Sequence, residues 1–390
     1  MADKHAVLSA SASHRWLVCT PSARLEEQFP ASESEYAAAG TEAHKLCEIR
    51  TSYKMGAIKP EDYAKELEDF VKTAKYYDEE MRECADAYVD LVTEKLEGAA
   101  ALCDDAFMEL EVKVDFSKYV KKGFGTSDCV IVSDDVLEII DFKYGKGVLV
   151  EAENNTQMML YALGAYEKYK SLYDINGIRM TIFQPRLRKE PSEWEISIGE
   201  LLEWGKNYVK PRAQLAYNGQ GEFAPSEETC RFCKAKAQCA ARMNENLKVF
   251  NDSPDPLIAT VEEVAEVLKK AKDIRAWLSD MEDFVTSKLF EGQTVPGWKL
   301  VEGRSNRKIA DEEKAVERFV AAGIAEPLLY ETKLISLTQM EKDFGKKHVA
   351  EILGDLLVKP QGKPTLAPES DKRPAMALED QVLKAFDEGR

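Results

Sequence analysis

The spacing of apolar and polar residues divides the chain into a helical first part and a following part that contains strands. Apolar positions follow helical spacing up to about residue 98, with a helix-forming run at 37–49 and a charged amphipathic stretch from 60 to about 96. From residue 106 the period changes to two, which predicts three strands with short turns: FMELEVKVDF, CVIV and VLEIIDF. Helical spacing returns at 154–168, and IRMTIFQPR and WEISI are two further strand candidates before a helix at about 199–217.

This order of elements predicts an α/β or α+β fold in which helices flank a mixed central sheet. A linker candidate, NDSPDP, stands at 251–256, and the pattern beyond it is mainly helical. We therefore expect a sheet-containing domain over residues 1–250, a mainly helical accessory domain over 256–358, and an extended tail rich in Pro and Lys over 359–390.

Composition narrows the class of protein. The chain has 390 residues, of which 44% are hydrophobic and 32% charged, as expected for a globular protein of two or more domains. No apolar run approaches the roughly 20 residues that span a bilayer, and the start, MADKHAVLSA, lacks a signal-peptide core, so we expect a cytoplasmic location. The net charge of −17 disfavours nucleic acid without excluding it, because a local basic groove can lie on an acidic body.

Two acids in neighbouring predicted strands are the first candidate site residues. Asp128 precedes CVIV, Asp141 lies near the end of VLEIIDF, and the tight turn between the strands lets the two carboxylates converge. Such a pair is unfavourable unless a cation neutralises it, and oxygen ligands suit Mg²⁺ or Mn²⁺. Strand alternation puts Lys143 on the same face as Asp141, where metal and ammonium together can activate water and stabilise a phosphoryl group. The alternative is an acid–lysine pair on a solvated sheet edge.

Three further features bear on these acids. Gly40 and His44 form G-x3-H on a predicted helix, so an imidazole is available as a nitrogen ligand or as a structural residue. Gln157 and Tyr161 share one helix face at i, i+4 spacing. Glu111 stands in the preceding strand, where a supporting role and a plain surface position are equally open.

The eight cysteines are unevenly spaced. Four of them occur singly in helix-like or strand-like segments, where buried inert thiols are expected: Cys47, Cys84, Cys103 and Cys129. Cys230, Cys233 and Cys239 instead form C-x2-C-x5-C in a predicted loop. Because disulfides are rare in the cytoplasm, this cluster indicates metal binding, and four thiolates suit either zinc or an iron–sulfur cluster.

The ordered motifs G-x3-H, Asp128, D-x-K and Q-x3-Y together resemble the RecB-type nucleases of the PD-(D/E)xK superfamily. With Cys19 before these motifs and three cysteines after them, the chain is similar to the iron–sulfur branch, which includes the nuclease domains of bacterial helicase–nucleases and the CRISPR-adaptation nucleases. More narrowly, the segments SASASHRW, GTEAH, FGTSD, DFKYGKG and NNTQMMLYALGAY resemble the phage and prophage family DUF2800, which occurs among replication or recombination genes. Ser127 replaces the superfamily's proline, and Asp141 replaces the alternative glutamate.

The resemblance implies a PD-(D/E)xK core, a restriction-endonuclease-like fold, and a metal-dependent deoxyribonuclease. We expect an exonuclease that acts on single-stranded DNA or DNA ends rather than a site-specific enzyme, because no segment resembles a base-reading module. Its metal ligands would be His44, Asp128, Asp141 and the carbonyl of Phe142; Lys143 would orient the attacking water, and Gln157 and Tyr161 would position the lysine or DNA. A 4Fe–4S cluster, or alternatively Zn²⁺, would be held by Cys19, Cys230, Cys233 and Cys239.

The same resemblance implies a setting in the cytoplasm of a bacterial host, with a phage single-strand-binding or recombination protein, or a separate helicase, as a partner besides DNA. Two other interpretations remain at this point. The chain can be a non-catalytic DNA-binding or scaffold protein that keeps the nuclease fold, or a zinc-stapled protein of unrelated function.

Overall fold

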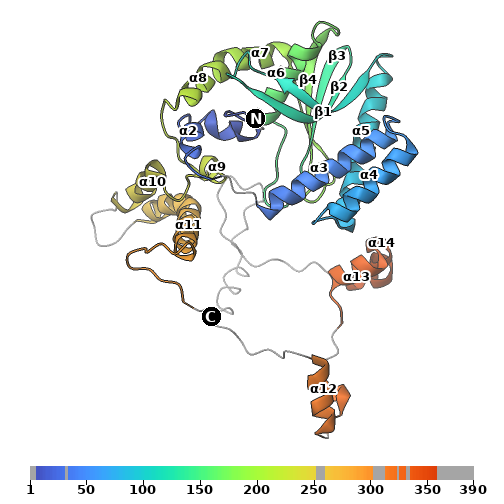
Figure 1. The fold of residues 1–390 in the computed structure, drawn as a ribbon, viewed down its shortest axis with the longest axis vertical. Coiled ribbons are helices and arrows are strands. Elements are labelled where there is room, and N and C mark those ends of the chain that lie inside the picture. Colours follow the sequence, from blue (N-terminus) through green and yellow to red (C-terminus); the bar gives the residue numbers. More distant parts are fainter. Residues whose placement is uncertain are drawn as a thin grey trace. The chain divides into compact units, whose positions relative to one another are not determined.

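The computed structural model describes residues 6–30, 34–251, 260–301, 312–322, 325–330 and 334–357 (Figure 1). The chain forms two compact units, residues 1–294 and 295–390. The first unit contains the sheet and every residue expected in a site. In the second unit the described elements are helical, namely α12 (Glu312–Ala321), η3 (Glu326–Leu329), α13 (Leu337–Phe344), α14 (Lys346–Leu353) and η4 (Gly354–Leu356). The expected tail over 359–390 and most of the expected linker lie outside the described residues, so the proposed domain limits stay predictions.

The first helices begin where the sequence supplies caps. The side chain of Ser34 accepts a hydrogen bond from the Ala37 amide at the start of α3 (Glu35–Lys54). The side chain of Asp78 accepts one from the Met81 amide at the start of α5 (Glu79–Ala100). Pro60 occupies the first turn of α4 (Pro60–Thr73). Three short helices precede them: η1 (Ala10–Ala12), α1 (Ser13–Trp16) and α2 (Ser22–Glu26).

The predicted mixed sheet is confirmed. It contains five strands in sequence order, β1 (Phe107–Asp115), β2 (Phe124–Val132), β3 (Asp135–Phe142), β4 (Ile175–Phe183) and β5 (Ser192–Ser197). β3 and β4 pair in parallel, and the other neighbours are antiparallel. A parallel pair needs a long crossover connection, and α6 (Thr156–Tyr169) provides it.

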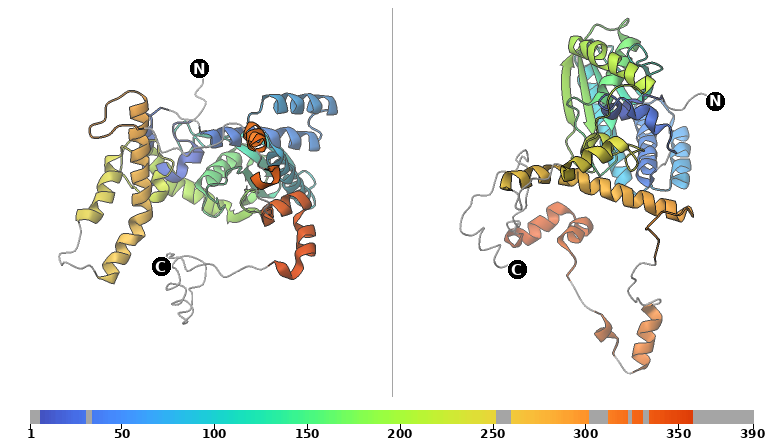
Figure 2. Two further views of the ribbon diagram at one scale, coloured as in Figure 1. Left: turned by 90° about the horizontal axis from the view of Figure 1, so that it is seen from below. Right: turned by 90° about the vertical axis from the view of Figure 1, so that its left-hand side faces the viewer.

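Helices cover both faces of the sheet (Figures 1 and 2). On one face α6 packs over an apolar core that includes Val130, Ile139 and Leu160. On the other face α3 and α5 pack over a second core that includes Leu46, Ile131 and Ile140. Because apolar side chains project from both faces of the sheet, the central strands are buried on both sides. Near-continuous apolar runs such as CVIV are typical of such strands.

The rest of the first unit is helical. Its elements are α7 (Ile198–Trp204), the π-helical turn η2 (Gly205–Val209), α8 (Lys210–Asn218), α9 (Glu227–Cys230), α10 (Ala240–Asn251) and α11 (Val261–Phe290). Among the described helices, none combines the length and the apolar character that a membrane span requires.

Candidate active site

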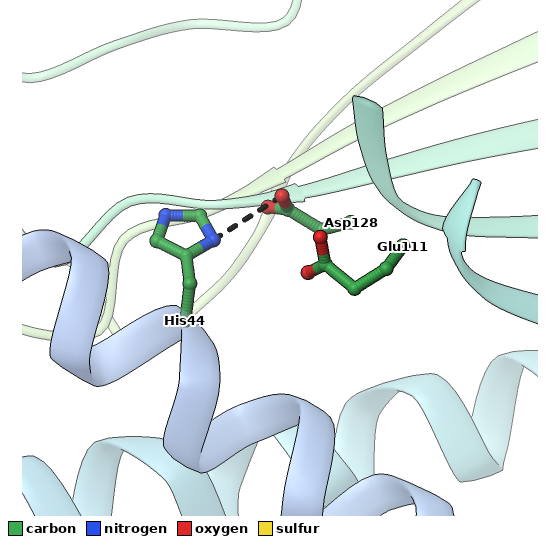
Figure 3. Close-up of side chains that lie close together, drawn as sticks. All are labelled: His44, Glu111 and Asp128. Carbon is green, nitrogen blue, oxygen red and sulfur yellow. Dashed lines mark ion pairs between the residues drawn. The ribbon is translucent and has the colours of Figure 1, made fainter. Parts of the chain in front are cut away.

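One histidine and two carboxylates from three different elements meet beside the sheet. His44 in α3, Glu111 in β1 and Asp128 in β2 place potential ligand atoms within 4.8 Å of one another. Nδ1 of His44 lies 3.2 Å from Oδ1 of Asp128. Figure 3 shows the imidazole directed from α3 toward Asp128, with the carboxyl group of Glu111 next to them. A nitrogen and two carboxylates at this spacing can hold a divalent cation.

Glu111 occupies an unusual backbone position. It is a non-glycine residue with a φ of 48°, in the sparsely populated left-handed region. Leu110 before it packs on the α3–α5 side of the sheet, whereas Val112 after it packs on the α6 side. Residues two apart in a regular strand share a face, so the strand reverses its alternation here. The β1–β2 ladder pairs Leu110 with Cys129 and Val112 with Ser127, so Glu111 and Asp128 lie between these two pairs. The reversal therefore brings the carboxylates of Glu111 and Asp128 together.

The second oxygen of Asp128 connects this group to the end of β3. Its Oδ2 accepts a hydrogen bond of 2.8 Å from the backbone amide of Phe142, beyond the pair of Cys129 with Ile140 that ends the β2–β3 ladder. The Phe142 ring also meets the His44 ring edge to face, with 5.5 Å between centroids. Phe142 therefore orients both side chains through its amide and its ring. The role expected of its carbonyl stays a prediction.

Asp141, Lys143, Gln157 and Tyr161 form a hydrogen-bonded set on the α6 side. Nζ of Lys143 lies 2.9 Å from Oδ2 of Asp141 and donates to Oε1 of Gln157 at 3.2 Å. Nε2 of Gln157 lies 3.1 Å from Oδ1 of Asp141 and 3.3 Å from the Tyr161 hydroxyl. Gly125 permits this packing, because a Cβ there would come within 2.7 Å of the Tyr161 ring. The set fixes the lysine beside a buried carboxylate.

The charges of the two groups interact. Burial lowers the pKa of His44, but the carboxylates of Asp128 and Asp141 outweigh it, and the pKa is raised overall. Although part of its side chain reaches solvent, burial and the charge of Asp128 raise the pKa of Glu111 to about 7. Burial raises the pKa of Asp141 despite the opposing Lys143, while Asp141 outweighs burial and raises the pKa of Lys143. The site thus concentrates negative charge that a cation would relieve.

The arrangement differs from the expected ligand set in one respect. His44 and Asp128 stand together as the sequence suggests, but their third neighbour is Glu111 rather than Asp141. Asp141 is instead held by Lys143 and Gln157, and it adjoins the first group through Phe142. The strand reversal that recruits Glu111 depends on its backbone conformation and leaves no signal in the sequence.

All four expected cysteines line one small cavity in the first unit. Cys19 lies 211 residues before Cys230 (230 − 19), yet both contribute to it together with Cys233 and Cys239. Burial raises the pKa of the thiols of Cys19, Cys230 and Cys233, the last to about 12. Thiolates here would therefore require a bound cation. The donor set fits zinc or an iron–sulfur cluster, because both accept four cysteine ligands.

Other residues, which the motif pattern did not indicate, join the two segments around this cavity. Glu26 accepts hydrogen bonds from the Arg15 side chain at 2.9 Å and from the Lys234 amide at 2.8 Å. Thr20 donates to the carbonyl of Gln220 at 2.7 Å. The N-terminal segment is thus fastened by protein contacts as well as by any metal.

Comparison with known proteins assigns the chain to a family. Residues 5–374 match the family described as "Protein of unknown function (DUF2800)", so the chain belongs to DUF2800, and the resemblance seen in the sequence is confirmed. Among solved structures, an Eubacterium rectale protein described as "Putative exonuclease" matches at 14% identity over 65% of this chain and 90% of that chain, with a TM-score of 0.31. The protein SSO0001 matches at 16% identity over 57% of this chain and 95% of that chain, with a TM-score of 0.21. With scores this low, the family assignment rests on the sequence match.

Proposed function

We propose that this chain is a divalent-metal-dependent deoxyribonuclease that hydrolyses phosphodiester bonds as an exonuclease in phage replication or recombination. The observation that carries the proposal is the adjacency of two groups. A His–Glu–Asp set suited to a cation lies next to the buried Asp141, which is paired with Lys143 and hydrogen-bonded to Gln157. A hard cation beside an ammonium group is an arrangement suited to phosphoryl chemistry. The order of the motifs agrees with the RecB-type resemblance.

In this proposal each residue has a defined task. His44, Glu111 and Asp128 hold Mg²⁺ or Mn²⁺, with Asp141 and the Phe142 carbonyl as the further ligands that the resemblance implies. The bound metal supplies Lewis-acid activation of water and of the scissile phosphate. Lys143 carries a proton because Asp141 raises its pKa, so it orients the attacking water and stabilises developing negative charge. Gln157 fixes the lysine by accepting its hydrogen bond.

The four cysteines hold a 4Fe–4S cluster in this proposal, with Zn²⁺ as the alternative. Their role is structural, since they join segments 211 residues apart (230 − 19), and closing so long a loop carries an entropic cost. Metal analysis and the visible spectrum of the purified protein distinguish the two cofactors. A wild type that is stable, colourless and free of both metals would contradict this part of the proposal.

The test of the nuclease is digestion of end-labelled linear DNA and of circular DNA with Mg²⁺, Mn²⁺ or EDTA. We expect the linear substrate to be shortened from an end only when metal is present, while intact circular duplex survives. Asp128→Asn is the matched variant and should be inactive. Equal digestion by wild type and variant would indicate a contaminating nuclease, and DNA binding without hydrolysis would favour the non-catalytic alternative.

Cation binding should strengthen as pH rises. Below their raised pKa values, about 7 for Glu111, His44 and Glu111 are both protonated and unavailable as ligands. The logarithm of the Mn²⁺ association constant should therefore rise by up to about two per pH unit in acidic solution, where each group releases a proton on binding the cation. Calorimetry measures this slope, and His44→Gln should reduce it to about one or less. A slope of zero in wild type would contradict the assignment.

Glu111→Asn should separate stability from cation binding. Asparagine tolerates the left-handed conformation better, and the substitution removes a charge beside Asp128, so the metal-free protein should gain about 1 kcal/mol in free energy of unfolding. Its affinity for Mn²⁺ should fall at least about tenfold because a carboxylate ligand is lost. Glu48→Gln is the control, since Glu48 lines the same hollow but stands outside the ligand set. An unchanged affinity in Glu111→Asn would exclude Glu111 as a ligand.

A further inference from the structure

A small hollow adjoins the proposed cation ligands on the side of the sheet that α3 and α5 cover. Its lining combines the three ligands with residues from α3, α5, β1 and β3: His44, Glu111 and Asp128, together with Cys47, Glu48, Tyr88, Leu110 and Phe142. The volume of the hollow is about 10 Å³, which is close to the space that one buried water molecule needs. The hollow therefore suits a single water molecule rather than a substrate.

Tyr88 brings a buried hydroxyl group to this hollow from α5. The residue is 2% exposed, and its hydroxyl has no hydrogen-bond partner among the described residues. Buried polar groups in folded proteins nearly always have a partner, and ordered water supplies it where no protein group does. The Tyr88 hydroxyl is therefore expected to hydrogen-bond to a molecule inside the hollow.

The neighbours of this hydroxyl include one strong acceptor. Burial raises the pKa of Tyr88 well above its usual value, so the hydroxyl keeps its proton and acts as a donor. Cys129, Asp128 and Cys47 are the ionisable groups that act on it most strongly. Burial also raises the pKa of both thiols well above the usual value, so they stay protonated, and a neutral thiol is a weak acceptor. The carboxylate of Asp128 is the strong acceptor of the three.

Asp128 has room for a further hydrogen bond. Its Oδ1 lies 3.2 Å from Nδ1 of His44, and its Oδ2 accepts a hydrogen bond from the Phe142 amide at 2.8 Å. A carboxylate offers about four acceptor sites, so a cation and a water molecule can be accommodated besides these contacts. A water molecule in the hollow can accept a hydrogen bond from the Tyr88 hydroxyl and donate one to Asp128.

The ring of Tyr88 belongs to the same group of packed side chains. It contacts the Phe142 ring with 5.3 Å between centroids, and the Phe142 ring in turn meets the His44 ring at 5.5 Å. Because the Phe142 amide also holds Asp128, these aromatic contacts fix Tyr88 relative to both ligands. The hydroxyl is thereby held in place beside the hollow.

We propose that Tyr88 orients Asp128 for cation binding through one water molecule held in this hollow. The inference rests on the proposed function, because the cation is the one assigned to the nuclease site. Tyr88 is a positioning residue, since it acts through Asp128 and not directly on the cation or the DNA. Hydrogen bonds to a metal ligand fix its orientation, and loss of such a contact typically lowers metal affinity by about 10- to 100-fold.

The test is Tyr88→Phe, which removes the hydroxyl and keeps the ring. Calorimetry of the full chain with Mn²⁺ as the titrant should give an association constant about 10- to 100-fold below that of wild type. The melting temperature of the metal-free protein should equal that of wild type or exceed it, because a buried hydroxyl without a protein partner is removed. Equal affinity in wild type and variant would overturn the inference. A lower melting temperature would assign the hydroxyl to the fold alone and would overturn it as well.

Thr51→Val is the matched control. Thr51 lies in α3 and is fully buried, and its hydroxyl also lacks a hydrogen-bond partner among the described residues, but it stands outside the lining of the hollow. The substitution should leave the Mn²⁺ affinity unchanged. An equal loss of affinity in Thr51→Val and Tyr88→Phe would show a general effect of removing buried hydroxyl groups and would contradict the specific role of Tyr88.

The pH dependence separates an orienting residue from a ligand. Tyr88 keeps its proton when the cation binds, so the logarithm of the association constant should rise equally steeply with pH in Tyr88→Phe and in wild type. A shallower rise in the variant would mean that the phenol loses its proton on binding, which would make Tyr88 a ligand instead. Weakened Mn²⁺ binding in Tyr88→Phe, with a wild type that binds Mn²⁺ but hydrolyses no DNA, would refute the nuclease and keep this inference. A wild type that binds no Mn²⁺ would refute both.

Discussion

Asp141→Asn is expected to abolish DNA hydrolysis and to leave the metal-free fold at least as stable as wild type. The substitution removes the carboxylate that holds Lys143 and adjoins the cation group, so the hydrolysis rate should fall by a factor of about 10³ or more. The side chain of Asp141 is only 3% exposed, and burial raises its pKa, which means that its charge is costly in the absence of metal. An uncharged amide of the same shape avoids this cost, and the Lys143 side chain, which is 27% exposed, can still reach solvent without its partner. End-labelled digestion and urea denaturation measure the two effects.

Lys143→Met provides the matched comparison because it removes the other member of the pair. It should also lose hydrolysis, but it leaves an ionised carboxylate buried without its partner, which typically costs about 3–5 kcal/mol. The cost should depend on pH. An acid whose pKa is raised by folding destabilises the folded state least at low pH, where it is protonated. It destabilises the fold increasingly as the pH rises above its pKa in the unfolded chain. The variant should therefore regain stability on acidification, whereas Asp141→Asn should not. Similar stability of both variants at neutral pH would contradict this electrostatic account.

Cys19→Ser is the second change with a large expected effect. It removes one ligand of the four-cysteine cavity and should reduce the iron or zinc content of the protein to near zero. We expect a loss of at least about 3 kcal/mol in free energy of unfolding, or about 5 °C in melting temperature for a unit of this size. The Arg15–Glu26–Lys234 contacts remain, so part of the N-terminal segment should stay docked. Elemental analysis and calorimetry measure these changes.

Cys103→Ser is the control for this experiment. Cys103 follows α5, is partly exposed, and lies outside the cavity that the other four cysteines line. Its exposure also corrects the expectation that all four isolated cysteines are buried, which holds for Cys47, Cys84 and Cys129. The control should keep its metal and its melting temperature. Equal metal content in Cys19→Ser and Cys103→Ser would remove Cys19 from the ligand set.

The fold class and the placement of most elements can be read from the amino-acid sequence. Alternating apolar residues between 106 and 142 predicted three strands, and all three are present as β1, β2 and β3. Caps such as Ser34 and Asp78 fix helix starts through contacts between residues three apart. These features are readable because periodicity and capping depend on neighbours in the chain. Family membership was likewise readable, because the order of motifs is a property of the sequence.

Which side chains of the site meet depends on how the whole chain folds. Glu111 joins His44 and Asp128 because one residue with positive φ reverses the face of β1. Tyr88 lines one hollow with His44 and Asp128 although the three residues belong to different segments of the chain. Such contacts arise from strand register, helix packing and the closure of long loops. They depend on the energy of the whole fold, so a local pattern of residues cannot specify them.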